Sequence, residues 1–390
     1  MTARQPCAVN RQPSTVNRQH LSFKKVIGQS KVKDSLRFMT EGDRIPHALL
    51  FIGPEGCGKL ALAMAFSQYI LCQNKVENDA CGKCPSCSKA SKFIHPDVHF
   101  SFPTVGSKVT SDMFLPEWRK AMEENSYLDI NQWLQSIGAE NKQGNITKDE
   151  CTNIVKKLSL KTFESSKKFL IMWLPEYLGN EGNRLLKLIE EPPEDTHFIL
   201  VAEKQELILN TILSRCQLVK INQLQDTEIV EGLLQNGSIE ETKANAIAPL
   251  SDGNLNEALK MVESMDNDNA SLFLNWLRKC FVGNGVELFK WVETFAKLGR
   301  ENQKQFLKYG LHFMREYMAL KMTGGTMSPR LQGEELITAQ KLTKVIEFDQ
   351  IEKIVKLFTD CAYFVERNAN PKVLFLDTSI QLNQILKRKR

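Results

Sequence analysis

The sequence predicts an α/β domain followed by an all-helical region. Short apolar runs alternate with helical periodicity up to about residue 222, a pattern typical of a parallel sheet covered by helices. After Gln223 the strand-like runs stop and helical periodicity continues, broken by Gly and Asn. The 390 residues suffice for two or three domains. We expect an extension at 1–20, an α/β domain at 21–222, a small helical domain at 223–268 and a larger helical domain at 269–390.

Composition and charge exclude several classes of protein. Hydrophobic residues make up 42% and charged residues 25%, as in soluble globular proteins. The formal net charge of +5 comes from arginines within residues 1–20 and from the basic run 387–390. Because such ends usually lie outside the folded part, the charge is weak support for a nucleic-acid-binding surface. No apolar run approaches the roughly 18 residues of a membrane-spanning helix, so we expect no membrane partner.

The first elements in order are an amphipathic helix over 23–41, a strand over 48–52 and a helix over 60–71. Between the strand and the second helix lies a glycine-rich loop. The remaining predicted elements of the α/β domain are helices at about 147–159 and 180–191 and strands at 169–173, 198–202 and 217–221. A polar insertion at 106–145 carries Trp118 and Trp133 on apparent helices, and a loop is expected at 324–333.

The glycine-rich loop fits the pattern G-x-x-x-x-G-K from Gly53 to Lys59, with Gly56 and Gly58 inside it. Successive N–H groups of such a loop, with the helix N-terminus behind them, cradle phosphates, and the lysine reaches the terminal ones. The next residue should be Ser or Thr to bind Mg²⁺, but it is Leu60. An apolar side chain cannot ligate a hard cation. The pattern indicates descent from a phosphate loop and argues against magnesium-dependent hydrolysis, which weakens the case for bound ATP or ADP.

A second acidic site would be expected after a neighbouring strand, where carboxylates hold the metal and polarise water. The matching strand 169–173 ends in Trp173-Leu174-Pro175, so both acidic positions are apolar. Glu176 comes two residues later and is interpreted as a solvated surface carboxylate. Two independent metal-handling positions are therefore missing.

Four of the ten cysteines form the pattern C-x8-C-x2-C-x2-C: Cys72, Cys81, Cys84 and Cys87. Four thiolates close a tetrahedral site with no open position, which is the structural arrangement for Zn²⁺. The N-terminal region lacks an apolar secretory segment, so we expect a reducing cytoplasm, where disulfides are disfavoured. The nearby His95 and His99 are expected to be loop and strand residues, and the other six cysteines packing residues.

Several segments, in order, resemble the clamp-loader branch of the AAA+ ATPases, and in particular the bacterial DNA polymerase III delta-prime family. The segments are Val26–Gln29, Ile45–Phe51 with the phosphate loop, the four-cysteine knuckle, Asn183–Pro193 with its Glu-Glu-Pro-Pro, and Thr211–Cys216 with its Ser-Arg-Cys. Together they cover about residues 22–260.

The resemblance implies an AAA+ P-loop domain with an inserted zinc knuckle, a small helical lid and a C-terminal helical collar. It implies a five-subunit ring with motor ATPase and delta subunits, which loads a sliding clamp onto primer–template DNA. In that family the Ser-Arg-Cys arginine reaches the neighbour's ATP site. Arg215 would then be an arginine finger acting in trans, with direct DNA contact weak or indirect. The place of work would be the cytoplasmic replisome at the nucleoid.

Departures from the family pattern indicate a subunit without autonomous activity inside the polymerase III holoenzyme, a nucleotidyltransferase complex. Asn256 stands where active members carry a lid arginine, and Ala202-Glu203 replaces a polar sensor. With Leu60, these losses favour a non-catalytic delta-prime-type subunit. Two alternatives stay open: an active gamma/tau-type ATPase motor that uses Lys59, and a zinc-knuckle nucleic-acid-binding module.

Overall fold

The computed structural model describes residues 22–42, 45–140, 142–237, 239–263, 269–324, 331, 333–343 and 345–387. The side chains of Glu263 and Glu301 are not described. The predicted extension at 1–20, most of the basic C-terminal run and most of the predicted loop at 324–333 lie outside these ranges. The described residues form two compact units. One contains those up to 237 together with 253–256, and the other contains 239–252 and those from 257 onward.

The first unit is built on a five-stranded parallel sheet in the order β2-β3-β4-β1-β5. The strands are β1 (Ala48–Ile52), β2 (Val98–Ser101), β3 (Lys168–Trp173), β4 (Thr196–Ala202) and β5 (Gln217–Lys220). The helical elements are α1 (Ser30–Glu41), α2 (Lys59–Leu71), α3 (Pro85–Ala90), η1 (Ser111–Phe114), α4 (Leu115–Glu124), α5 (Ile130–Ser136), α6 (Lys148–Leu158), η2 (Pro175–Leu185), α7 (Leu186–Glu190), η3 (Gln205–Leu207), α8 (Asn210–Leu213) and α9 (Asp226–Gln235). This confirms the predicted fold class, an α/β domain that precedes a helical region.

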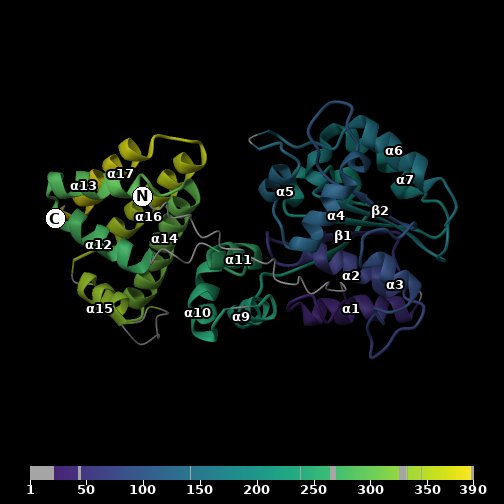
Figure 1. Ribbon diagram of the computed structural model, residues 1–390, viewed down its shortest axis with the longest axis horizontal. Coiled ribbons are helices and arrows are strands. Elements are labelled where there is room, and N and C mark those ends of the chain that lie inside the picture. Colours follow the sequence, from purple (N-terminus) through teal and green to yellow (C-terminus); the bar gives the residue numbers. More distant parts are fainter. Residues whose placement is uncertain are drawn as a thin grey trace, which may run out of the picture. The chain divides into compact units, whose positions relative to one another are not determined.

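Alternate side chains of the central strands enter two cores, one on each face of the sheet. On β1, Leu49 and Phe51 pack with α2, whereas Ala48 and Leu50 pack on the face that α6 covers. Figure 1 shows the strands between these helical layers. Burial on both faces explains why β1, β3 and β4 are continuous apolar runs in the sequence. The loop after β1 therefore opens at the carboxyl edge of the sheet, between β4 and β5.

The structure differs from the predicted elements in three places. His99 was expected to be a strand residue and lies on β2, but no strand range was predicted there, because the Val-His-Phe-Ser sequence is short and half polar at the edge of the sheet. Helix α1 begins at Ser30 rather than near residue 23, since Gly28 and Gln29 both have positive φ. The helix predicted at 180–191 is the 3₁₀ segment η2 followed by α7.

The polar insertion at 106–145 has a buried aromatic centre. Trp118 on α4 and Trp133 on α5 lie with ring centroids 5.2 Å apart, and both are fully buried against the core that α2 also joins. The indole of Trp118 stacks on Phe102 at 4.3 Å, and the Trp133 indole N–H donates to the carbonyl of Pro103. The insertion is thus an integral layer of the α/β unit.

The second unit is all-helical, as predicted for the C-terminal region. It contains α10 (Glu241–Ile247), η4 (Ala248–Ser251), most of α11 (Leu255–Glu263), α12 (Asn269–Val282), α13 (Gly285–Phe295), α14 (Arg300–Met322), α15 (Gly333–Leu342), α16 (Phe348–Glu366) and α17 (Pro371–Lys387). Helices α12–α17 gather into one bundle (Figure 1). Phe273 and Phe358 meet at Gly310 of α14, where an added Cβ would come within 2.8 Å of the Phe273 ring. This core is separate from those of the sheet.

Candidate functional site: phosphate loop, arginine and metal centre

The predicted phosphate loop forms the turn from β1 into α2. Gly56 and Gly58 have φ of 67° and 87°, conformations that glycine adopts without strain, and Gly58 is the N-cap of α2. Lys59 is the first residue of α2, and its side chain is 5% exposed. The structure thus brings Gly53, Gly56, Gly58 and Lys59 together as the motif predicts.

The ammonium group of Lys59 is already paired within the chain. Its Nζ lies 3.0 Å from Glu203 Oε1 and donates to the carbonyl of Pro54 at 2.9 Å. Glu203 directly follows β4, at the position where a polar sensor was expected. The positive charge that would contact phosphates is therefore balanced by a carboxylate of the same domain.

Glu176 is not the solvated surface carboxylate that we expected from the sequence. Its Oε1 accepts hydrogen bonds from the N–H groups of Glu203 and Lys204, and its buried Oε2 has no hydrogen-bond partner among the described residues. Burial raises the pKa of Glu176, although the two N–H groups oppose this shift. Glu176 thus holds the turn that presents Glu203 to Lys59.

The apolar positions predicted from the sequence are buried. Leu60 packs in the core with α2, and Trp173 and Leu174 close the end of β3. None of these three side chains offers an oxygen to a metal ion. Asn256, at the lid position, is fully buried and bonds to Asn125 and Asp129 of the insertion.

Arg215 lies between α8 and β5, with 30% of its side chain exposed. Its guanidinium forms an ion pair with Glu190 of α7, with Nε 2.6 Å from Oε1, and also donates to the carbonyl of Thr211. Glu190 is the first glutamate of the Glu-Glu-Pro-Pro segment. The arrangement holds the guanidinium at the surface of the unit.

The four predicted metal ligands come together. The Sγ atoms of Cys72, Cys81, Cys84 and Cys87 all lie within 4.8 Å of one another, and those of Cys81 and Cys87 are 4.0 Å apart. A tetrahedral zinc site with Zn–S near 2.3 Å needs sulfurs about 3.8 Å apart. The N–H groups of Lys83 and Cys84 point at the Cys81 sulfur and lower the pKa of that thiol to about 6. The donor set could therefore hold a metal ion, and a structural zinc ion stays a prediction.

His95 does not join the cysteine cluster. Its Nε2 contacts the hydroxyls of Ser86 and Ser165, and its Nδ1 accepts from the N–H of Asp97. Ser86 stands between two knuckle residues on α3, so this network attaches the knuckle to the segment that leads into β2. Burial lowers the pKa of His95, which favours the neutral ring.

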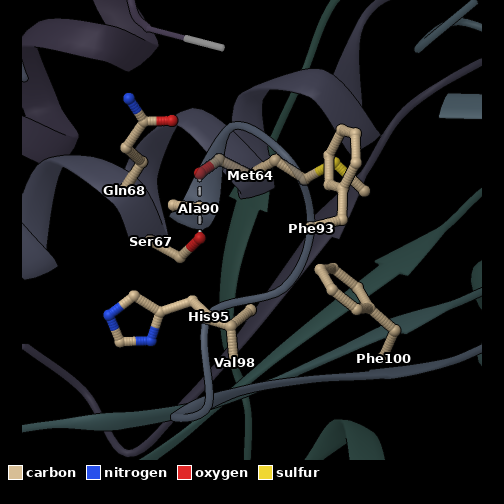
Figure 2. Close-up of a pocket in the computed structure, with 8 residues that line it drawn as sticks. All are labelled: Met64, Ser67, Gln68, Ala90, Phe93, His95, Val98 and Phe100. Atoms are coloured by element: carbon tan, nitrogen blue, oxygen red, sulfur yellow. Dashed lines mark hydrogen bonds between the residues drawn. The ribbon is translucent and has the colours of Figure 1, made fainter. Parts of the chain in front are cut away.

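Figure 2 shows a small cavity beside this network, between α2, α3 and β2. Ser67, Gln68 and His95 line it together with Met64, Ala90, Phe93, Val98 and Phe100. It has room for about one water molecule, and within the described ranges the buried Nε2 of Gln68 has no hydrogen-bond partner. The cavity is far too small for a nucleotide.

Comparison with known proteins follows the same segments. Residues 28–225, about half of the chain, match the family model described as DNA polymerase III, delta subunit. The chain belongs to the DNA polymerase III delta-subunit family of clamp-loader proteins. The matched range contains the phosphate loop, the cysteine knuckle and Arg215 of this delta-family chain.

Three relatives illustrate the range of similarity. The chain is 28% identical over 243 residues to the DNA polymerase III subunit delta' of Bacillus subtilis, covering 62% of this chain and 60% of the relative. It is 24% identical to subunit tau/gamma of Haemophilus influenzae and 25% identical to subunit tau of B. subtilis, each over 62% of this chain. The alignments span only 30% and 37% of the latter two.

Solved structures align more loosely. A gamma-subunit-related protein from Thermotoga maritima covers 91% of this chain and 99% of its own, at 16% identity and a TM-score of 0.39. The B. subtilis clamp loader delta protein covers 91% of this chain and all of its own, at 10% identity and a TM-score of 0.32.

No helix among the described residues is both long and apolar enough to span a membrane. Sequence reasoning gave no role at the phosphate loop to Glu203, Glu176, Tyr127, Asn125, Asp129 and Asn254. All of them contact the phosphate loop or the groups around it. Their only sequence signal is the Asp129-x-x-Gln132 capping box of α5, which predicts a helix start but no role at the loop.

Proposed function

We propose that this chain is a non-catalytic, delta-prime-type subunit of the bacterial DNA polymerase III clamp loader. It would help load the sliding clamp onto primed DNA and supply Arg215 to a neighbouring ATPase subunit. One observation carries the proposal: the buried Lys59 is paired with Glu203, beside an apolar residue at the magnesium position. A lysine held this way is not free to stabilise a transferring phosphoryl group.

Arg215 has the chemistry for a role in trans. Its planar guanidinium stays charged and can grip two phosphate oxygens at once. It is partly exposed, and its carboxylate partner Glu190 is also at the surface. A surface ion pair of this kind is worth at most about 1 kcal/mol, so a neighbour's phosphates can compete for the arginine.

The remaining cofactor and partner assignments follow from the same proposal. The cysteine cluster would hold one structural Zn²⁺, which contributes folding free energy and no chemistry. The helical region from 269 onward would be the collar that joins the motor and delta subunits in a five-subunit ring. Apolar side chains exposed on α12 and α13, Phe281, Val282, Val286 and Phe289, are suited to such contacts. Primer–template DNA would be contacted weakly or through the partners, at the nucleoid-associated replisome.

The experiment is ATP hydrolysis by a complex reconstituted from this chain, its motor and delta subunits, the clamp and primed DNA. Replacing the guanidinium in Arg215→Ala should lower hydrolysis at the neighbouring site by at least about tenfold, since arginine fingers contribute roughly 10³–10⁵ in rate. Arg215→Lys should restore little, because an ammonium lacks the fork geometry. Assembly, followed by size-exclusion chromatography, should be unchanged.

Arg184→Ala is the matched control, because Arg184 is also exposed and paired with a nearby glutamate, Glu181. It should leave hydrolysis at the wild-type rate. Equal rates for Arg215→Ala and the wild type would refute the role in trans.

A gamma/tau-type motor is the second candidate, favoured by the intact G-x-x-x-x-G-K pattern and by the tau and gamma relatives. It requires that Lys59 leave Glu203 when nucleotide binds. For the nucleic-acid-binding module, most of the supporting basic residues lie outside the described part of the chain. The motor candidate is tested by the isolated chain's own hydrolysis.

A further inference from the structure

The phosphate loop is covered by side chains from two distant parts of the first unit. Tyr127, from the insertion between α4 and α5, packs on Gly58: a Cβ added there would lie 2.8 Å from the tyrosine Cε1 and 3.2 Å from its Oη. Asn254 packs on Gly56, where an added Cβ would lie 1.8 Å from the asparagine Oδ1. Only glycine leaves room for these neighbours. Gly56 and Gly58 are thus in contact with side chains from other segments of the same unit.

Hydrogen bonds fix the tyrosine in place. Its Oη accepts from the N–H of Ile27 at 3.0 Å, and its own N–H donates to the Oδ1 of Asn125 at 2.8 Å. Burial raises the pKa of Tyr127, which keeps the phenol neutral. The ring is therefore held over the N-cap of α2 by contacts on both sides.

A second set of bonds joins the insertion to residues 254–256. Asn125 donates to Asn256 at 2.7 Å, and Asn256 donates to Asp129 at 3.2 Å. The other carboxylate oxygen of Asp129 caps α5 by accepting from the N–H of Gln132. Asp129 is 4% exposed and Asn256 is fully buried. Beside them, the N–H of Leu255 donates to the carbonyl of Gly56.

These contacts lie at the loop that would hold a phosphate group. An anion bound to such a loop must approach its N–H groups and the N-terminus of α2. Tyr127 and Asn254 lie against two glycines of this loop, and Glu203 pairs with Lys59.

We propose that residues 125–129, together with Asn254 and Asn256, form a built-in cover over the phosphate loop. The cover lies against the loop where a nucleoside triphosphate would otherwise bind. The insertion at 106–145 thereby gains a role: it keeps this subunit closed to nucleotide whatever the ATP concentration. The inference rests on the proposed function in treating the loop as non-catalytic, but it concerns binding rather than Arg215.

The test is calorimetric titration of ATP, with and without Mg²⁺, into the full chain. The wild type should bind ATP more weakly than about 1 mM, near −4 kcal/mol. Tyr127→Ala should tighten binding at least tenfold, and more in a Glu203→Ala background that also frees Lys59. Asn256→Ala, which removes both bonds to the insertion, should act in the same direction. Tyr363→Ala, at an exposed tyrosine of the second unit, is the control and should match the wild type.

Hydrogen exchange of the peptide that carries Ile27 measures directly whether Tyr127 stays over the phosphate loop. Tyr127→Phe keeps the ring but removes the acceptor oxygen, so this amide should exchange faster while the melting temperature changes little. The inference is overturned if the wild type binds ATP at micromolar concentrations, or if neither Tyr127→Ala nor Asn256→Ala tightens binding in either background. If a variant fails to fold, the other one and the exchange measurement decide. The hydrolysis assay with Arg215→Ala reads a neighbour's site, so either idea can fail without the other.

Discussion

Two glutamates outside the phosphate-loop motif set the surroundings of Lys59, the lysine of that motif. Glu203 pairs with Lys59, and Glu176 holds the backbone of Glu203 through its N–H group. Glu203 follows β4, the neighbour of β1, and Glu176 follows β3, one strand further along the sheet. The same sheet edge that could serve phosphate chemistry is thus used for an internal ion pair.

Removing this ion pair should destabilise the first unit. Among the described residues, Glu203→Ala leaves the buried ammonium of Lys59 with the Pro54 carbonyl as its one hydrogen-bond partner, which we expect to cost about 2 kcal/mol of unfolding free energy. This corresponds to a melting temperature lower by roughly 4–8 °C for a unit of this size, measured by circular dichroism. Glu206→Ala, at an exposed glutamate on η3, is the control and should change it by less than about 1 °C. A wild-type melting temperature for Glu203→Ala would show that the pair is not needed.

The buried carboxyl group of Glu150 should make the stability of the protein depend on pH. Glu150 is 2% exposed, and this burial raises the pKa of its carboxyl. Its Oε1 has no hydrogen-bond partner in the part of the chain that the structure describes. A raised pKa in the folded state means that stability is greatest at low pH for this group and is lost as the pH rises through that value. Glu150→Gln avoids the charge and keeps an acceptor for Ser111.

We therefore expect Glu150→Gln to stabilise the protein by about 1 kcal/mol at pH 7.5 and by clearly less at pH 4. Thermal unfolding at the two pH values measures the difference. Glu123→Gln, at an exposed position on α4, should show no such pH dependence. An equal effect of Glu150→Gln at both pH values would contradict the shift.

At this scale the sequence predicted the residues that belong to local patterns. The four cysteines, the loop from Gly53 to Lys59 and the apolar Leu60 follow from spacing within a few positions. Tyr127 and Glu203 could not be predicted, since their partners lie 69 and 144 positions away from them, at Gly58 and Lys59 respectively. Only the fold brings such pairs together.

At the scale of elements, the cysteine knuckle is attached to the rest of the unit at two points. Asp79, inside it, accepts from the N–H groups of Phe23 and Lys24, and Ser86 on α3 contacts His95. The knuckle therefore links the segment before α1 to the segment before β2. A metal ion that holds the four sulfurs would stabilise both connections.

Loss of the metal should weaken this link. Cys81→Ser should remove bound zinc, expected as one ion per chain, and lower the melting temperature by roughly 5–10 °C, as does a chelator on the wild type. Elemental analysis and thermal unfolding measure the two effects. Cys216→Ser, outside the cluster, should keep its zinc. A Cys81→Ser protein with full zinc content would contradict the four-thiolate site.

Strands with unbroken apolar sequences were predicted well. Elements with a mixed polar and apolar sequence or with an internal interruption were not. Strands β1, β3 and β4 are buried on both faces and read as unbroken apolar runs, whereas β2 at the edge has a polar His99 in its centre. Segment η2 has a helical pattern, but Gly179 interrupts it with a φ of 50°. Local pattern does not reveal such an interruption.

At the scale of the whole molecule, the candidate site features and the proposed contact surface lie in different units, each with its own core. The α/β unit carries the phosphate loop, the knuckle and Arg215, and the helical unit carries the exposed apolar side chains of α12 and α13. The family match over residues 28–225 falls on the first unit. The proposed domain limits at 222 and 268 stay a prediction, because residues 253–256 lie with the first unit and 239–252 with the second.

The central claim is that this chain's own phosphate loop does not hydrolyse ATP, and the steady-state ATPase rate of the isolated full chain tests it most directly. We predict no Mg²⁺-dependent turnover above background, and the same rate for the wild type and for Lys59→Ala. Measurable Mg²⁺-dependent turnover in the wild type that Lys59→Ala abolishes would contradict the account and identify a motor subunit.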